Sequence, residues 1–372
     1  MNAWLPRALA QWFALLIGVA ALVACLLLGL SREPKQALLS YLFAFFFFMG
    51  LSIGSLALLM IHAITGGAWG DCIRPPLLAA ARLLPLMALA AIPVLVWMRL
   101  LYPWTGSAPN AQAQSWYLAD TFFVIRTVVY FVVWIGWLIE FTRSLDDPVR
   151  ARRIAAPGLI VFGVTSLLAS VDWAVSLTPH WHSSVFGMMV GTGWLLGACA
   201  LATAVAASWR DRERTVAPDV LHDLGNLLLM FVLGWSYLVF MQYLTVWIAD
   251  LPDENAWYIP RTLTSWRYLA WFLIAFNFAL PFAVLLSRAA KRHHAWLRAI
   301  AVMLIVASFA DAFWLIVPGS RTGGFALRWT DLCAPVGIGA LWWCGWFGQL
   351  RAARSAWISS ATAADELEQS HG

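Results

Sequence analysis

Residues 37–60 read ALLSYLFAFFFFMGLSIGSLALLM, a run of apolar and small residues without one charged side chain. An α-helix rises about 1.5 Å per residue, so a run of this length would cross the roughly 30 Å hydrocarbon core of a bilayer. Backbone N–H and C=O groups in lipid must pair within their own segment, and a helix achieves this. The stretch therefore predicts a transmembrane helix.

Apolar runs of the same kind recur along the whole chain. Ten are long enough to cross a membrane: residues 9–30, 37–60, 77–101, 118–142, 155–177, 185–208, 225–249, 266–287, 297–317 and 331–350. The first is too long for the core of a cleaved signal peptide and lacks a small-x-small cleavage site, so it predicts a retained helix. Pro85 and Pro93 lie inside the third run and predict a kink there.

The composition excludes the soluble domains that 372 residues could otherwise form. Hydrophobic residues make up 62% of the chain and charged residues 12%, and the mean hydropathy is +0.75. A soluble protein needs roughly a quarter of its residues charged. We expect a single polytopic membrane domain over residues 1–350. A short cytoplasmic tail, residues 351–372, follows and ends in the polar, irregular run Asp365–Gly372.

Basic residues predict the orientation of the chain in the membrane. Of the 24 lysines and arginines, 16 fall in segments on the side of the N-terminus and 7 on the opposite side, while Arg126 lies within a helix. Because cytoplasmic loops carry the excess of Lys and Arg, both termini are predicted to be cytoplasmic. The sequence pI of about 9.1 then reflects this bias, and no basic domain is present to bind nucleic acid.

Small residues and acids suggest an internal repeat. Gly50 and Gly54 have the four-residue spacing that lets helices approach closely, as do pairs in the sixth run. The fifth and ninth runs each carry an acid near the outer end, Asp172 and Asp311. The pattern predicts an all-α fold with two four-helix bundles in parallel orientation, helices 2–5 (residues 37–177) and helices 6–9 (residues 185–317). Helices 1 and 10 would be peripheral. Since Gly and Ala are common in transmembrane helices, the repeat could also be fortuitous.

Polar and ionisable residues within the runs sort into two depths around an almost uncharged centre. The outer level holds Arg126, Asp172, Gln242 and Asp311, and the inner level holds His62, Glu140, His222 and Asp223. Charged groups in a membrane are costly, so each is a functional candidate. One hypothesis is a proton path built from two half-channels. The alternative is that Arg126 and Asp172 form a structural ion pair while the inner residues cap helix ends.

The outer stretch DWAVSLTPHWH, residues 172–182, is denser in polar and aromatic groups than an aromatic belt requires. A quinone site needs an apolar aromatic pocket near one membrane surface, with polar groups that hold the carbonyls and take up protons. The candidate residues for this outer polar cluster are Arg126, Asp172, Trp173, His180 and His182.

The cysteines and histidines do not suggest a metal cofactor. The five cysteines are scattered without a C-x-x-C motif, and the seven histidines fall at helix ends or in loops. Iron–sulfur clusters and covalently attached haem need clustered ligands. We expect no haem, iron–sulfur cluster or metal site in this chain.

Three motifs carry a resemblance to a known family. The first runs from Asp172-Trp173 through Ser176-Leu177 and Pro179-His180-Trp181 to Phe186-Gly187. The second begins at Leu221-His222-Asp223-Leu224-Gly225 and continues through Gln242-Tyr243 to Trp257-Tyr258, and the third runs from Gly54 through His62 to Trp69. Together they resemble the NrfD-like membrane subunits of alternative complex III, in particular the ActF-type quinone-binding subunit 2. The chain departs from the family pattern at Val175, Thr178, His182 and Asn226, where the family has Met, an acid, Tyr and Lys.

This resemblance implies a multi-pass subunit of a quinol-oxidising respiratory complex in the bacterial inner membrane. It implies a fold of ten helices in two bundles, a bound quinone or quinol, and a contribution to proton movement. The partners would be a paralogous NrfD-like subunit together with iron–sulfur and multihaem cytochrome subunits, so the chain would not be catalytic alone. Two alternatives stay open at this point, a secondary transporter, whose repeats tend to be inverted, and a purely structural membrane subunit.

Overall fold

The structure is a computed structural model that describes residues 5–105, 116–178, 181–211, 214–321 and 323–371. The first half contains α1 (Leu5–Arg32), α2 (Pro34–Thr65), α3 (Ala68–Ala81), α4 (Leu84–Val96), α5 (Met98–Leu101), η1 (Trp116–Leu118), α6 (Asp120–Arg143), α7 (Pro148–Trp173), η2 (Val175–Leu177) and α8 (Phe186–Ala206). A two-residue hairpin follows, β1 (Arg210–Asp211) and β2 (Arg214–Thr215).

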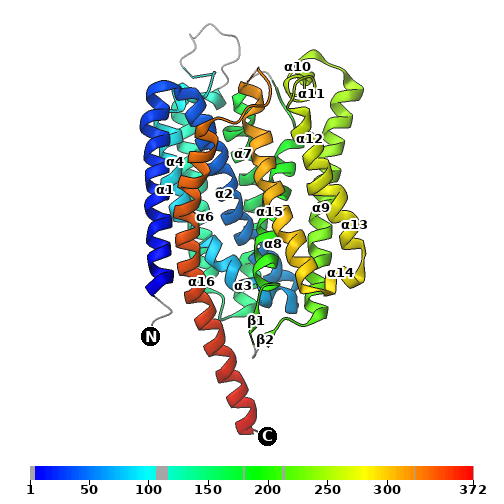
Figure 1. The fold of residues 1–372 in the computed structure, drawn as a ribbon. Coiled ribbons are helices and arrows are strands. Elements are labelled where there is room, and N and C mark those ends of the chain that lie inside the picture. Colours follow the sequence, from blue (N-terminus) through cyan, green and yellow to red (C-terminus); the bar gives the residue numbers. More distant parts are fainter. Residues whose placement is uncertain (1–4, 106–115, 179–180, 212–213, 322, 372) are drawn as a thin grey trace.

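The second half contains α9 (Pro218–Ala249), α10 (Pro252–Asn255), α11 (Ile259–Thr262), α12 (Arg267–Leu273), the π-helix η3 (Ile274–Ala279), α13 (Leu280–Leu286), α14 (Arg288–Arg292), α15 (His294–Ile316), η4 (Pro318–Ser320) and α16 (Trp329–His371). In the described ranges, nine helical segments are long and apolar enough to cross a membrane. The tenth expected run is the first half of α16, which lies against α1 (Figure 1). The predicted all-α membrane fold of about ten helices is confirmed.

Both chain ends lie at the same end of the helix bundle (Figure 1). We call this the inner end and the opposite one the outer end, following the orientation predicted from the basic residues. The first group of helices is α2, α3–α4, α6 and α7, and the second is α8, α9, α12–α13 and α15, with contacts between successive members of each group. The two groups meet where α2 packs against α8 and α15.

Helix α2 occupies the centre because it is apolar on every side. A helix without a polar face has no side to turn toward water or headgroups and is covered by other helices. The most apolar 18-residue window of α2 is entirely buried. Phe43 lies edge-on to Phe309 and Phe313 of α15, with ring centroids 5.2 and 5.0 Å apart, which ties the first group to the second.

The contact between α2 and α8 depends on the glycines that the sequence singled out. A Cβ atom on Gly50 would lie 2.1 Å from the indole of Trp194, and one on Gly54 would lie 2.4 Å from the Trp194 carbonyl oxygen. Because the second clash is with backbone, α8 would have to move to relieve it. The close approach predicted from the glycine spacing is confirmed at these two positions.

The third membrane segment begins earlier than predicted. The apolar run predicts a start at residue 77, but α3 begins at Ala68, directly after a turn in which Gly66 and Gly67 have φ of 69° and 101°. Asp71 and Arg74 interrupt the apolar pattern and hid this part of the helix. The predicted kink is present, because the helix stops at Ala81 and resumes at Leu84, with Pro85 near the start of α4.

The chain after residue 350 also differs from expectation. We predicted a short irregular tail, but α16 continues as a helix to His371. Residues 351–369 contain six alanines together with arginine and glutamate, which have high helix propensity and can extend a helix beyond the membrane. The prediction followed apolar runs, and these residues are too polar to extend the run that ends at residue 350.

Replacing Gly54 by Ala should destabilise the protein by about 1–3 kcal/mol, because the added methyl group overpacks the α2–α8 contact. The measurement is the midpoint of thermal unfolding of the purified chain in detergent. Gly136→Ala is the matched control, since a Cβ there meets no atom within 4 Å. Equal midpoints for the two variants would contradict the close α2–α8 contact.

Candidate functional site

The outer end of the first group contains a buried ion pair. The Arg126 guanidinium of α6 donates through Nε to Asp172 Oδ2 at 2.9 Å and through Nη2 to Oδ1 at 2.7 Å. The Tyr130 hydroxyl, one turn along α6, donates to the same Oδ2 at 2.7 Å. The Asp172 side chain is fully buried on α7. The predicted pairing of Arg126 with Asp172 is confirmed, and its two-pronged geometry is the strong form of such a contact.

Aromatic groups enclose this ion pair from the outer side. The Arg126 guanidinium carbon lies 3.8 Å from the centre of the Tyr117 ring and 4.5 Å from that of Phe122. Burial, together with the negative charge of Asp172, raises the pKa of Tyr117 to about 12 and that of Tyr102 well above its usual value. Both tyrosines are therefore protonated at neutral pH. The Tyr102 hydroxyl donates to the Trp173 carbonyl oxygen at 3.3 Å.

A groove open to the membrane lies beside the ion pair, between α4 and α6. Its volume is about 530 Å³, and apart from Thr127 its walls are apolar residues of these two helices, among them Ala91, Phe131, Ile135 and Gly136. Thr127 Oγ1 accepts a hydrogen bond from Trp173 Nε1 at 3.4 Å, and Phe131 stacks on the Trp173 ring at 6.1 Å. The groove wall thus contacts Trp173, the residue that follows Asp172 in the chain.

Other residues proposed for the outer cluster have different positions. His180 lies outside the described residues, and His182 is exposed. Between them, Trp181 is buried, stacks on Trp257 at 5.1 Å and donates to the Glu254 carbonyl oxygen.

Gln242 has a local role at the same end of the molecule. Its Oε1 accepts a hydrogen bond of 2.5 Å from the Ser183 hydroxyl, which in turn accepts from the backbone of Val185 and Phe186 at the start of α8. Gln242 thus holds the start of α8 in place.

The four residues proposed for the inner part of a proton path lie at three separate places, with His222 and Asp223 adjacent on α9. His62 Nε2 is 3.0 Å from the Gly67 carbonyl oxygen in the turn between α2 and α3. Glu140 pairs with Arg150 at 2.5 Å, and both side chains are about half exposed. His222 contacts Asn226 and lies 3.8 Å from the exposed Asp223. Contacts among the described residues do not join these three places into one chain.

Asp311 of α15 lies where α2, α8 and α15 meet and has a different environment from Asp172. It accepts a hydrogen bond of 3.3 Å from Trp235 Nε1, and in the described part of the chain no basic side chain pairs with it. It lines a cavity of about 20 Å³, which is room for one water molecule. Ser308 and Trp194 line the same cavity. Their polar atoms, Ser308 Oγ and Trp194 Nε1, have no hydrogen-bond partner among the described residues.

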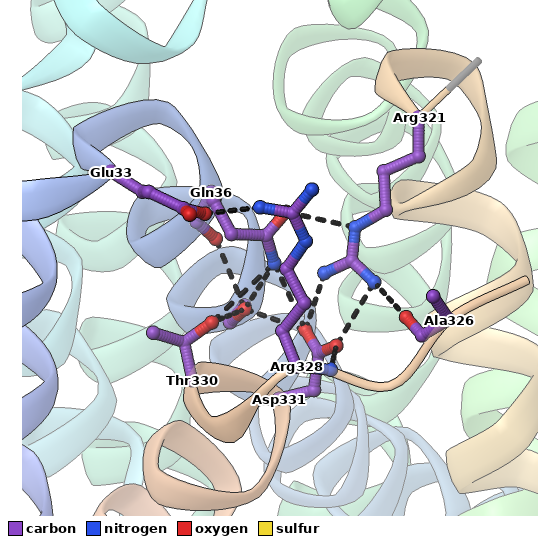
Figure 2. A network of polar contacts seen from close by, with 8 residues as sticks. Glu33, Gln36, Arg321, Ala326, Arg328, Thr330 and Asp331 are labelled. Carbon is purple, nitrogen blue, oxygen red and sulfur yellow. Dashed lines mark hydrogen bonds and ion pairs between the residues drawn. The ribbon is translucent and has the colours of Figure 1, made fainter. Parts of the chain in front are cut away.

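Sequence reasoning missed a polar network at the outer end that joins α2 to α16 (Figure 2). Arg321 donates to both oxygens of Asp331, at 2.6 and 2.9 Å, and through Nε to Gln36 Oε1 at 2.8 Å. Ser40 of α2 donates to Asp331 Oδ1 at 2.6 Å, and Arg328 pairs with Glu33. Arg321 precedes the tenth apolar run and Asp331 is its first residue, a place where loop charges are common, so only the fold shows that they are buried.

Arg261 was missed for the same reason. It is almost fully buried, its guanidinium donates to the carbonyl oxygens of Trp257, Trp314 and Leu315, and it lies 3.5 Å from the Trp257 ring centre. Burial lowers its pKa to about 9, so it stays protonated at neutral pH. Its position at the end of α15 lets the cation stabilise the helix dipole.

Comparison with known proteins gives little on family. No family model matches the chain. An MFS-type transporter, opaD of Aspergillus ustus, is 26% identical over 104 residues, which is 27% of this chain and 17% of the relative. The chain thus aligns with about a sixth of the length of this relative. In the described residues, no group of three or more His, Cys, Asp or Glu side chains has the arrangement of a metal site.

Removing one partner of the buried pair should be costly. We expect Arg126→Ala to lower the stability by about 3–5 kcal/mol, because it leaves the Asp172 carboxylate buried without a cation. The double variant R126M/D172L should recover most of this loss. Thermal unfolding in detergent measures both effects, with Arg150→Gln as the control, whose exposed pair contributes about 1 kcal/mol or less. A single variant as stable as the wild type would contradict a buried charge pair.

Proposed function

We propose that this chain is a membrane subunit of a quinol-oxidising electron-transfer complex and that quinol binds in the groove between α4 and α6. The observation that carries the proposal is the groove itself. It is open on the side of the bundle that faces lipid, from which a quinol must arrive, and its wall contacts Trp173, which follows the buried, tyrosine-bonded Asp172 in the chain. The motif resemblance to NrfD-like subunits supports the same function.

The residues around the groove suit the binding of a flat aromatic head group. Phe131 and the apolar side chains of α4 provide the surface for the ring, and Thr127 provides a hydroxyl in the groove wall. Oxidation of a quinol releases two electrons and two protons. The Tyr130 hydroxyl donates a hydrogen bond to Asp172. When the Tyr130 oxygen takes up a proton from the quinol, it can release its own proton along this hydrogen bond to the carboxylate. Arg126 orients the Asp172 carboxylate, so that its Oδ2 faces the Tyr130 hydroxyl.

In this proposal the electrons leave through iron–sulfur and multihaem cytochrome subunits, and a paralogous NrfD-like subunit lies alongside in the bacterial inner membrane. The chain would be oriented with both termini in the cytoplasm, as its basic residues predict. It would not be an enzyme alone.

The second group of helices would contribute to proton movement through Asp311. A buried carboxyl group that has an indole as its hydrogen-bond donor and no cation partner in the described residues can exist as the neutral acid or as the anion. The water-sized cavity beside it, with Ser308 in its wall, offers one step of a proton path. Three entry points at the inner end would be marked by His62, by Glu140, and by His222 with Asp223.

A secondary transporter is the second candidate, favoured by the local similarity to an MFS-type transporter. The π-helix η3 interrupts a membrane segment and contains the buried Asn277, whose side-chain oxygen has no partner in the described part of the chain. Such interruptions occur at functional sites. However, the halves of MFS transporters have six helices each, whereas the two groups here have four.

Filling the groove tests the quinol site. Gly136→Phe should lower labelling of α4 and α6 by a photoreactive ubiquinone analogue by about tenfold, a loss equivalent to 1.4 kcal/mol. Gly163→Phe is the matched control, because Gly163 is also a membrane-helix glycine with no atom near its Cβ position but does not line the groove. Labelling that stays unchanged in Gly136→Phe, or that maps to other helices, would refute the quinol site.

Asp311→Asn tests the proposed proton path. The amide keeps the size of the side chain and its contact with Trp235 but cannot bind a proton, so fewer protons should move per electron in the reconstituted complex. Asp120→Asn, at an outer helix end, is the control. An unchanged proton-to-electron ratio in Asp311→Asn would exclude this role. Substrate uptake by the chain alone in proteoliposomes would instead support the transporter.

A further inference from the structure

A strongly basic segment at the inner end has no role in the function proposed above. Residues 287–298 read SRAAKRHHAWLR, with four Lys or Arg residues, two histidines and no acid. They form α14 and the start of α15, at the lower right of the bundle in Figure 1. We call this segment the basic turn.

Two of its cations are used within the protein. Lys291 is buried, with its stem against Gly225 and its ammonium group 2.6 Å from Asn226 Oδ1. Arg292 pairs with Asp219 at the start of α9. These contacts fix the basic turn against α9 and determine where its other side chains point.

The remaining two arginines are uncompensated. Arg288 and Arg298 are exposed, and neither has a hydrogen bond or ion pair within the described ranges. The helices packed against α14 are α9, α13 and α15. Nearby acids come from α9 alone, namely Asp219, which is engaged by Arg292, and Asp223, which lies beside His222. The surface here therefore has a net positive charge. Two buried nitrogen atoms of the basic turn, Arg292 Nε and His294 Nδ1, also have no hydrogen-bond partner among the described residues.

An apolar track leads from this charge into the membrane. Arg298, Val302 and Val306 are four residues apart on α15 and so share one face of the helix. Val302 and Val306 are 48% and 53% exposed, and Trp296, in the first turn of α15, is 58% exposed. A tryptophan in this position is typical of the boundary between headgroups and acyl chains.

We propose that the basic turn is a binding site for an anionic glycerophospholipid. Arg288 and Arg298 contact the phosphate of the headgroup, Trp296 lies at the glycerol level, and an acyl chain packs along Val302 and Val306. Charge-assisted hydrogen bonds from arginine to phosphate supply the selectivity for an anionic lipid. The apolar track distinguishes a lipid from a free phosphate ion, which would not need it.

The experiment is native mass spectrometry of the purified chain in detergent, titrated with phosphatidylglycerol or with phosphatidylcholine. The double variant R288Q/R298Q should bind phosphatidylglycerol about tenfold more weakly than the wild type, which corresponds to 1.4 kcal/mol. The control R143Q/R153Q removes two exposed arginines from the inner end of the first helix group and should change the affinity less than twofold. The wild type should bind phosphatidylcholine about tenfold more weakly than phosphatidylglycerol.

Three outcomes would overturn the proposal. Equal losses in the two double variants would show that charge at the inner end acts diffusely, without a site. Equal binding of the two lipids would show that the headgroup charge is not recognised. The third outcome concerns competition by inorganic phosphate. If phosphate displaces phosphatidylglycerol equally well from the wild type and from the Val302→Asn variant, the site recognises an anion and the apolar track has no part in binding. Thermal unfolding of each variant checks that the loss is not due to misfolding.

Discussion

The structure depends on how each charge in the membrane is compensated. A carboxylate transferred from water to lipid loses several kcal/mol of hydration, which an opposite charge or hydrogen bonds must replace. Arg126 and Tyr130 provide the charge and the hydrogen bonds that replace the lost hydration of Asp172, and Arg321 and Ser40 provide them for Asp331. Both pairs lie at the outer end, where they join neighbouring helices.

Asp311 is the exception, and the contrast with Asp172 suggests a division of labour between the two helix groups. The bidentate arginine fixes the geometry around Asp172, whereas Asp311 has an indole donor and borders a water-sized cavity. In the proposed function the first group provides a quinol site beside the groove, and the second provides a step of proton exchange.

Packing between the groups is set by α2. Its apolar surface on every side requires cover from α7, α8, α15 and α16, and Gly50 and Gly54 allow α8 to approach closely. The sites on both sides of this helix are therefore rigidly related, although no polar contact needs to connect them. The basic turn lies at the inner end of the second group, where a bound lipid would stabilise the ends of α9 and α15.

The sequence alone determined the membrane fold, the approximate number of helices and the close-packed glycines, and it offered the pairing of Arg126 with Asp172 as one of two alternatives. These follow from local properties: apolar length, the four-residue period and the high cost of an unpaired charge in lipid. It could not show that Arg321, Asp331 and Arg261 are buried, that α3 starts at Ala68, or that a groove opens beside Thr127. Those features depend on which segments distant in the chain cover one another, and burial of a charge near a helix end is decided by its tertiary neighbours.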